Sequence, residues 1–271
     1  MTPNLLYCRY FESFLPLELH SLLLNNITFR ITEMIANELY QFSTGDALMA
    51  GVASHGLSIA DLLSYGDHGL GTFKFLVGEM IILDGNVYQM KSDGSIQNVD
   101  VTDKSIIAPF AMVTHFKPTI AVKILIPGKD ALFDILSKIV PGAHNLYLAM
   151  RMDGVFKSIT VRTVGGQSSP SEGLLDVGKH QVSHTLENIQ GTLIGFRSPR
   201  YMQGISVAGD HLHFISTTRS RGGHVLAFEA ETEVELKVTA IWKIHLELPR
   251  DTDFNNAYLA ADRAALAIVE G

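Results

Sequence analysis

Three of the 11 histidines in this 271-residue chain, His211, His213 and His224, have the spacing of a metal site. His211 and His213 are two residues apart in an apolar stretch, so on a β-strand both side chains lie on one face, roughly 6.5–7 Å apart along the backbone. A polar, glycine-rich turn follows. If the turn is centred on residues 218–219, the returning strand places His224 opposite His213, with Cβ atoms roughly 5 Å apart. The three imidazoles then converge on one point, each about 2 Å from a shared cation, which predicts an open three-histidine metal site.

The alternative for each of these histidines is an ordinary structural role. A single histidine on a strand is usually packed or hydrogen-bonded, but three on the same face of one hairpin are harder to explain in this way. Three neutral nitrogen ligands without a thiolate suit zinc, iron, nickel or copper, and the ligands alone do not select one of them. A fourth coordination position left for water or substrate would make the site catalytic rather than structural.

The composition is that of a globular protein with a sizeable core. Hydrophobic residues make up 46% of the chain and charged residues 18%, which excludes a disordered chain. A net charge of −7 without a basic cluster argues against nucleic acid or an anionic membrane as partner, and the apolar runs are far too short to span a membrane. The lone Cys8 excludes an intrachain disulfide and a cysteine-rich zinc site. Because the first residues lack the pattern of a secretory signal, we expect a cytoplasmic protein.

Short strands dominate the elements that must position these histidines, and the pattern predicts a sheet-rich α+β fold. Helices are expected to begin at Ser43-Thr44, over Ile59–Leu63, over Lys129–Ile139 and over about Asn255–Val269. Strands are expected in a hairpin over Gly78–Met90, in the histidine hairpin, and as two strands at 145–152 and 155–164 joined by Asp153-Gly154. Further strand segments are expected at 106–116, 118–126, 191–196 and 232–248.

The clearest linker is the glycine- and serine-rich stretch from Gly165 to about Gly173. It predicts three parts of the chain. Residues 1–38 form an unassigned N-terminal extension, residues 39–170 a mixed-sheet domain, and residues 171–271 an antiparallel metal-binding domain with a C-terminal helix and tail.

Several separate blocks of the sequence, from about residue 39 to the C-terminus, resemble the α-acetolactate decarboxylase family. They are Leu39–Thr44, Gly69–Thr72, Gly78–Ile81, Thr114–Pro118, Arg162–Val164, Gly191–Phe196, Gly209–Phe214 and Gly222–Leu226. A single His-x-His would be weak evidence, but a string of blocks in the right order is specific.

This resemblance implies a zinc enzyme that converts 2-acetolactate into (R)-acetoin and carbon dioxide, in acetoin and butanediol metabolism. It implies a mixed sheet followed by a smaller antiparallel sheet, and a homodimer. Zinc would be held by His211, His213 and His224.

The resemblance also implies roles for residues outside the hairpin. Glu79 matches the family's glutamate beside the metal, Arg162 its active-site arginine and Thr72 a threonine that lines the pocket. The family brings a glutamate from its C-terminal tail into the site, and Glu270 is the residue that this chain offers. Val77 departs from the pattern, which has an aspartate before the Gly-Glu pair.

Decarboxylation of a β-keto acid leaves an electron pair that delocalises into the ketone as an enediolate. A cation on the ketone and hydroxyl oxygens would stabilise this charge, and Arg162 could hold the departing carboxylate with its planar fork. Glu79, Glu270 and Arg162 are the candidates for delivering the proton that fixes the configuration of acetoin.

Two other classes of protein remain as alternatives. A cupin-like oxygenase would carry a glutamate four residues after the second histidine, where Thr217 stands. A non-catalytic metal-binding sheet module usually has four protein ligands.

Overall fold

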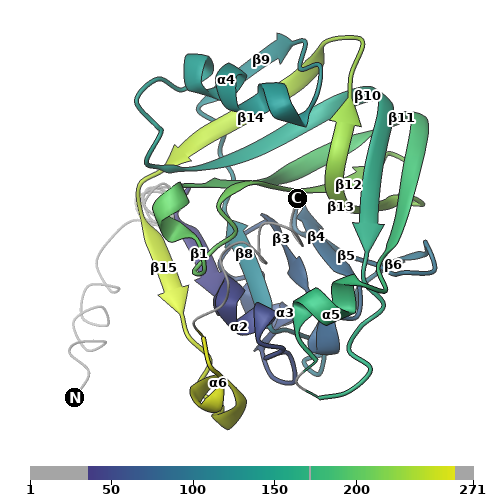
Figure 1. Ribbon diagram of the computed structural model, residues 1–271. Coiled ribbons are helices and arrows are strands. Elements are labelled where there is room, and N and C mark those ends of the chain that lie inside the picture. Colours follow the sequence, from purple (N-terminus) through teal and green to yellow (C-terminus); the bar gives the residue numbers. More distant parts are fainter. Residues whose placement is uncertain (1–35, 171, 260–271) are drawn as a thin grey trace, which may run out of the picture. The chain divides into compact units, whose positions relative to one another are not determined.

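The computed structural model describes residues 36–170 and 172–259, and the elements below belong to the compact unit that begins at Asn37. Two β-sheets dominate this unit (Figure 1). The predicted N-terminal extension, residues 1–38, lies almost entirely outside the described residues.

The first sheet has seven strands and is mixed. Its outer strand β15 runs parallel to β1, and every other neighbouring pair is antiparallel. In spatial order the strands are β15 (Ile244–Glu247), β1 (Leu39–Phe42), β8 (Phe110–Thr114), β3 (His68–Thr72), β4 (Glu79–Leu83), β5 (Asn86–Met90) and β6 (Ile96–Asn98). A separate pair consists of β2 (Leu57–Ser58) and β7 (Ile107–Ala108).

The second sheet has six strands and is antiparallel throughout. Strand β11 also pairs with β10, so that β10, β11, β12 and β13 close into a ring. In spatial order the strands are β11 (Val182–Ser198), β12 (Gly209–Ser216), β13 (Gly222–Glu229), β10 (Tyr147–Thr163), β14 (Val234–Ile241) and β9 (Ile120–Ile124). The predicted fold class, a mixed sheet with a smaller antiparallel sheet that carries the histidine hairpin, is confirmed.

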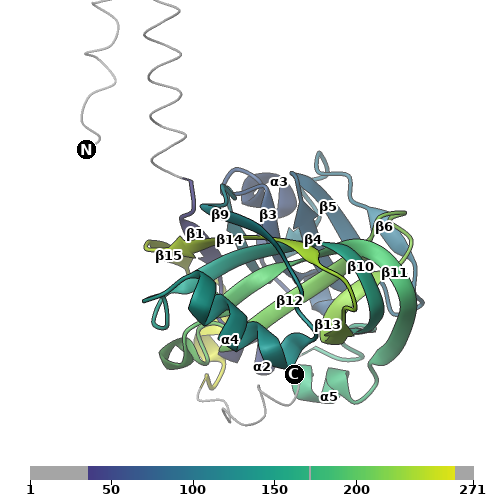
Figure 2. The same cartoon turned by 90° about the horizontal axis from the view of Figure 1, so that it is seen from above.

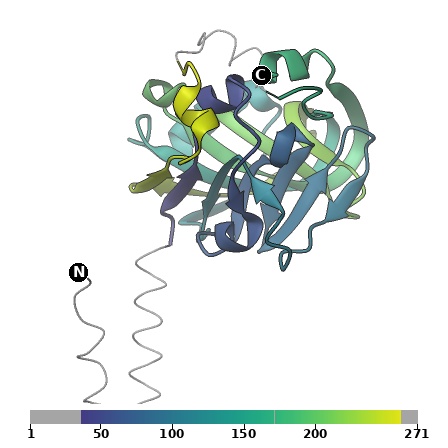
Figure 3. The same ribbon diagram turned by 90° about the horizontal axis from the view of Figure 1, so that it is seen from below.

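The helices are short except for one. They are α2 (Gly45–Met49), α3 (Ile59–Leu62), α4 (Lys129–Ile139), α5 (Leu174–Gly178) and α6 (Thr252–Asn256), with 3₁₀ turns η1 (Lys74–Leu76) and η2 (Arg200–Met202). Helix α4 lies against the six-stranded sheet (Figure 2). It buries its apolar stripe, Leu132 and Leu136, among side chains of that sheet. Helices α2, α5 and α6 lie on one side of the sheets (Figure 3). As the sequence predicts, Thr44 caps α2, with its hydroxyl accepting from the Ala47 amide.

A hydrophobic core fills the space between the two sheets. Leu70 and Ile81 from the seven-stranded sheet belong to the same buried cluster as Ile194, Phe196 and Ile215 from the six-stranded sheet. Burial of apolar surface on both inner faces holds the sheets against each other, and the polar residues of the site interrupt this core.

Two predicted elements are wrong. Residues 145–152 and 155–164 are not two strands but the single strand β10, because Asp153 accepts a hydrogen bond from the Thr192 hydroxyl and Gly154 lets Val234 pack closely across the sheet. The helix expected over Asn255–Val269 does not run as predicted: α6 ends at Asn256 and residues 257–259 are not helical. Most of that predicted helix lies outside the described residues.

The strands on either side of residue 170 are mixed between the sheets. β9 and β10 precede this residue but lie in the six-stranded sheet, while β15 follows it and lies in the seven-stranded sheet. The division into residues 39–170 and 171–271 therefore stays a prediction about folding units rather than a description of the sheets.

No helix among the described residues is long and apolar enough to cross a membrane.

Candidate functional site

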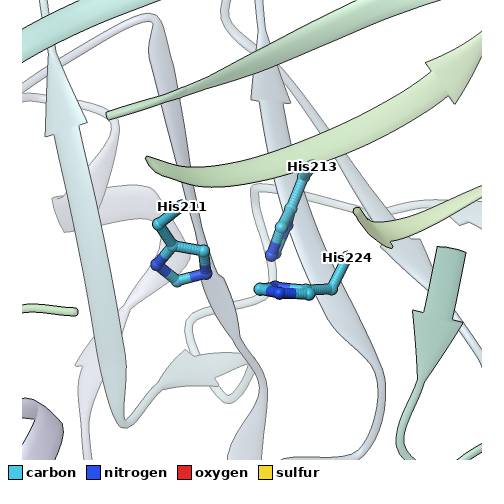
Figure 4. Close-up of side chains that lie close together, drawn as sticks. All are labelled: His211, His213 and His224. Atoms are coloured by element: carbon cyan, nitrogen blue, oxygen red, sulfur yellow. The ribbon is translucent and has the colours of Figure 1, made fainter. Parts of the chain in front are cut away.

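The histidine hairpin is built by β12 and β13 as the sequence predicts. His213 lies directly opposite His224, and His211 is two residues earlier on the same face of β12. The ring centroids are 5.3 Å apart for His211 and His213, 5.0 Å for His211 and His224, and 5.4 Å for His213 and His224. One ligand nitrogen from each ring lies within 4.8 Å of the other two (Figure 4). All three side chains are buried, so this set fits a metal with imidazole ligands.

A hydrogen bond to the backbone orients the His213 ring. The Nδ1 atom of His213 lies 2.7 Å from the carbonyl oxygen of Met80 on β4. Because a carbonyl only accepts, Nδ1 carries the proton, and the lone pair of the ring is on Nε2. This is the usual outer-sphere arrangement of a metal-binding histidine, in which the second nitrogen donates to a carbonyl or carboxylate.

Burial also keeps a second ligand neutral. It lowers the pKa of His211 to about 3, with smaller contributions from the positive charges of Arg162 and Lys129. A histidine must be neutral to bind a metal, so His211 is in the ligand form at neutral pH.

Arg162 and Glu79 meet beside the histidines from opposite sheets. Arg162, on β10, lies directly across from His224, and its side chain is 2% exposed. Its Nη1 atom is 3.2 Å from Oε1 of Glu79 on β4, and the other carboxylate oxygen of Glu79 is 3.7 Å from Nε2 of His213. A carboxylate and a guanidinium thus lie beside the three imidazoles in a buried setting, where electrostatic interactions are strong.

Thr72 lines a cavity that is also lined by Glu79, Arg162 and His211. It faces Glu79 across the β3–β4 hairpin, and its hydroxyl donates to the Gly78 carbonyl at 2.9 Å. Thr72, Glu79, Arg162 and His211 form the polar wall of this cavity. Of the sequence-predicted site residues, the structure therefore brings together Thr72, Glu79, Arg162 and the three histidines.

Glu270 is the remaining predicted site residue, and it lies outside the described residues. Val77, which departs from the family pattern, interacts with its neighbours through its backbone. Its carbonyl accepts a hydrogen bond from the side-chain amide of Gln89, and it forms an isolated β-bridge with Gly165. Its side chain is 39% exposed. The substitution therefore leaves the buried contact between Glu79 and Arg162 in place.

Sequence reasoning missed several residues that shape the site. The Met80 carbonyl was missed because a backbone acceptor has no signature in a sequence. The apolar wall of the cavity comes partly from Leu48 on α2 and Leu174 on α5, two leucines that look like any other buried leucine.

A second group of possible ligands among the described residues lies at the surface. His55, Asp251 and Asp253 also bring ligand atoms within 4.8 Å of one another. The Asp253 carboxylate accepts from the Ser54 hydroxyl, and Asp251 caps α6 by accepting from the Phe254 amide. These hydrogen bonds account for the arrangement, which lacks the burial of the histidine site.

Fold and site together define a sheet-rich protein with three buried histidines that could hold a metal ion between two sheets. A family model described as alpha-acetolactate decarboxylase matches residues 39–261. The chain belongs to the α-acetolactate decarboxylase family, whose members are carboxy-lyases.

Individual relatives agree with the family model. The chain is 41% identical to an alpha-acetolactate decarboxylase of Methanosarcina mazei over 87% of this chain and 81% of that protein. It is 39% identical to that of Klebsiella aerogenes over 85% of this chain and 87% of that protein. The crystal structure of alpha-acetolactate decarboxylase from Bacillus subtilis superposes with a TM-score of 0.80 at 33% identity, over 86% of this chain and 98% of that chain.

Proposed function

We propose that this protein decarboxylates 2-acetolactate to (R)-acetoin and carbon dioxide, with zinc held by His211, His213 and His224. The observation that carries the proposal is the buried group in which these ligands meet Glu79 and Arg162 beside a cavity. Membership of the α-acetolactate decarboxylase family supplies the substrate and the reaction class.

The bound cation would supply Lewis acidity toward the negative charge that develops on the substrate oxygens. Arg162 would hold the carboxylate of the substrate through its planar fork, in a pocket where the guanidinium is already buried and oriented. The bond between the carboxylate carbon and its neighbour then breaks. The electron pair stays on the neighbour, delocalised into the ketone, and carbon dioxide leaves.

One proton must then reach a single face of that carbon. Glu79 is held in place by Arg162 on one side, and by its position across the strands from Thr72 on the other. A carboxylic acid is a more usual proton donor than a guanidinium. We assign Glu79 this role or that of positioning the donor, with Glu270 as the second candidate.

Thr72 has a positioning role in this proposal. Its hydroxyl donates to the Gly78 carbonyl and so fixes the backbone directly before Glu79. An oxygen of the bound substrate could approach the lone pairs of the same hydroxyl.

The test is the conversion of racemic 2-acetolactate by the purified, metal-loaded chain, followed by chiral gas chromatography of the product. We expect one equivalent of carbon dioxide per acetoin and an excess of the R enantiomer. A folded, zinc-loaded chain that forms no acetoin faster than the spontaneous reaction would contradict the proposal.

The Glu270→Gln variant is expected to keep the metal and lose turnover. Full activity of this variant would contradict the assignment of the C-terminal tail to the site.

We also propose a homodimer in the cytoplasm, acting in acetoin and butanediol metabolism. Among the described residues, no strand pairs with the outer edge of β15, and Trp242, Ile244, Leu246 and Leu248 expose apolar side chains around it. An exposed apolar strand edge favours association with a second chain. Light scattering coupled to gel filtration tests this part; a monomer at micromolar concentration would contradict it.

A further inference from the structure

The lining of the cavity beside the histidines combines polar and apolar side chains. Its polar wall carries Thr72, Glu79, Arg162 and His211, which come from strands of both sheets. The remaining described side chains of the lining are apolar and form its apolar wall. They are Leu48, Leu76, Phe110, Val164 and Leu174.

Two of these apolar residues come from short α-helices. Leu48 lies on α2 and Leu174 on α5, and both are nearly fully buried. Gln167 connects the two segments, because its amide donates to the carbonyls of Gly51 and Glu172 at 2.9 and 2.8 Å. The start of α5 also packs directly on α2: a Cβ atom at Gly173 would lie 2.7 Å from the Met49 carbonyl oxygen. The helices therefore form one block that closes the apolar side of the cavity.

The carbon that loses its carboxylate in the proposed reaction carries four substituents. Three of them, the carboxylate, the hydroxyl and the acetyl group, have oxygen atoms that suit the polar wall. The fourth is an alkyl group without a polar atom. With the oxygens on the polar wall, the alkyl group points toward the apolar wall, where its burial is favourable.

We propose that Leu48 and Leu174 determine the size of the alkyl group that the enzyme accepts on the reacting carbon. This inference rests on the proposed function and deepens it by naming the residues that select the 2-alkyl group of the substrate. Both leucines lie outside the strand ladders, so shortening them enlarges the space beside the apolar wall and leaves the hydrogen bonds of the sheets intact.

The test compares kcat/KM for three acids: 2-acetolactate, its homologue with a 2-ethyl group, and its homologue with the extra carbon on the acyl side. In Leu48→Ala and Leu174→Ala, the ratio of the 2-ethyl to the 2-methyl substrate is expected to rise roughly tenfold or more, the usual effect of one methylene in an apolar pocket. The acyl homologue is expected to gain less.

The matched control is Leu175→Ala, the neighbouring leucine of α5. Its side chain is 38% exposed and does not line the cavity, so the ratio should stay that of the unsubstituted chain. Thermal unfolding checks that each variant is folded. If an alanine variant does not fold, Leu48→Val and Leu174→Val are expected to give a smaller shift in the same direction.

The possible results separate this inference from the proposed function. An unsubstituted chain that decarboxylates none of the three acids contradicts the proposed function itself. An unsubstituted chain that decarboxylates 2-acetolactate, together with folded variants whose ratios are unchanged, overturns only the role of Leu48 and Leu174. A gain confined to the acyl homologue also overturns it, since the alkyl group on the reacting carbon would then lie elsewhere.

Discussion

At the scale of single residues, the site combines three imidazoles with one carboxylate and one guanidinium. The position of His213 is constrained twice, because the Met80 carbonyl fixes its tautomer and His224 lies directly across from it. If water took the place of an imidazole held in this way, the site would be expected to lose the metal.

We therefore expect His213→Ala to lose both the metal and the activity. The measurement is zinc content by mass spectrometry after dialysis, together with the rate of acetoin formation. His184→Ala is the matched control, because His184 is exposed on β11 and should change neither quantity. Stoichiometric zinc in the His213→Ala protein would contradict the assigned ligand set.

Glu79 should behave differently from the histidines. Glu79→Gln keeps the shape of the side chain and removes its ability to transfer a proton, so we expect zinc content to be retained and kcat to fall roughly 100-fold or more. Glu187→Gln, an exposed change on β11, serves as control. Unchanged kcat in Glu79→Gln would remove this carboxylate from the chemistry and leave it a structural partner of Arg162.

At the scale of elements, the register of β11 against β12 places the first ligand. Arg197 and Asp210 are paired across these strands by two hydrogen bonds of 2.7 Å, and the guanidinium also lies over the ring of Phe133. Asp210 directly precedes His211, so this ion pair fixes the strand where the metal site begins.

We expect Arg197→Met to destabilise the fold by about 3–5 kcal/mol, because it leaves the largely buried Asp210 without its cation. Urea unfolding measures the loss, and Arg197→Met combined with Asp210→Leu should restore part of it. Lys179→Met is the control: it breaks an exposed ion pair with Asp176, which typically contributes less than about 1 kcal/mol. Equal losses in the two single variants would contradict this account.

His68 gives the interface between the sheets a dependence on pH. It is buried on β3, stacked on Phe116 and edge-on to Phe196. Burial, and secondarily the charge of Arg151, lowers its pKa from 6.5 to about 3. Between these two values the unfolded chain binds a proton that the folded chain does not, so stability is lost as the pH falls below 6.5.

This contribution amounts to roughly 1.4 kcal/mol per pH unit. Between pH 6.5 and 5, the stability of His68→Phe is therefore expected to fall by about 2 kcal/mol less than that of the unsubstituted chain. The stability of the control variant His184→Gln should fall as much as that of the unsubstituted chain. Urea unfolding at both pH values provides the comparison. Parallel losses in all three proteins would show that His68 does not cause the acid sensitivity.

At the scale of the whole molecule, local patterns predicted much of the fold. The alternation and turn residues around Asp84–Asn86 predicted the β4–β5 hairpin, and the apolar spacing in Lys129–Ile139 predicted α4. The histidine spacing predicted which rings converge, since opposition across a hairpin follows from the position of its turn.

What the sequence could not predict depends on contacts between distant segments. The Asp153-Gly154 pair has the composition of a turn, yet it continues β10 because Thr192 and Val234 pack against it. Glu79 and Arg162 come from different sheets, and their contact follows from sheet packing, which no local pattern encodes. Here the family resemblance singled out two residues that the structure brings into contact, where spacing offered no reason to choose them.

In the proposed function, one metal on the three histidines drives decarboxylation in the cavity between the sheets. The most direct measurement is a zinc titration of the chelated protein, with acetoin formation from 2-acetolactate as readout and His213→Ala in parallel. We predict a rate that rises to a plateau at one zinc per chain, and no recovery in the variant. Activity that survives complete chelation, or that zinc restores in His213→Ala, would contradict the account.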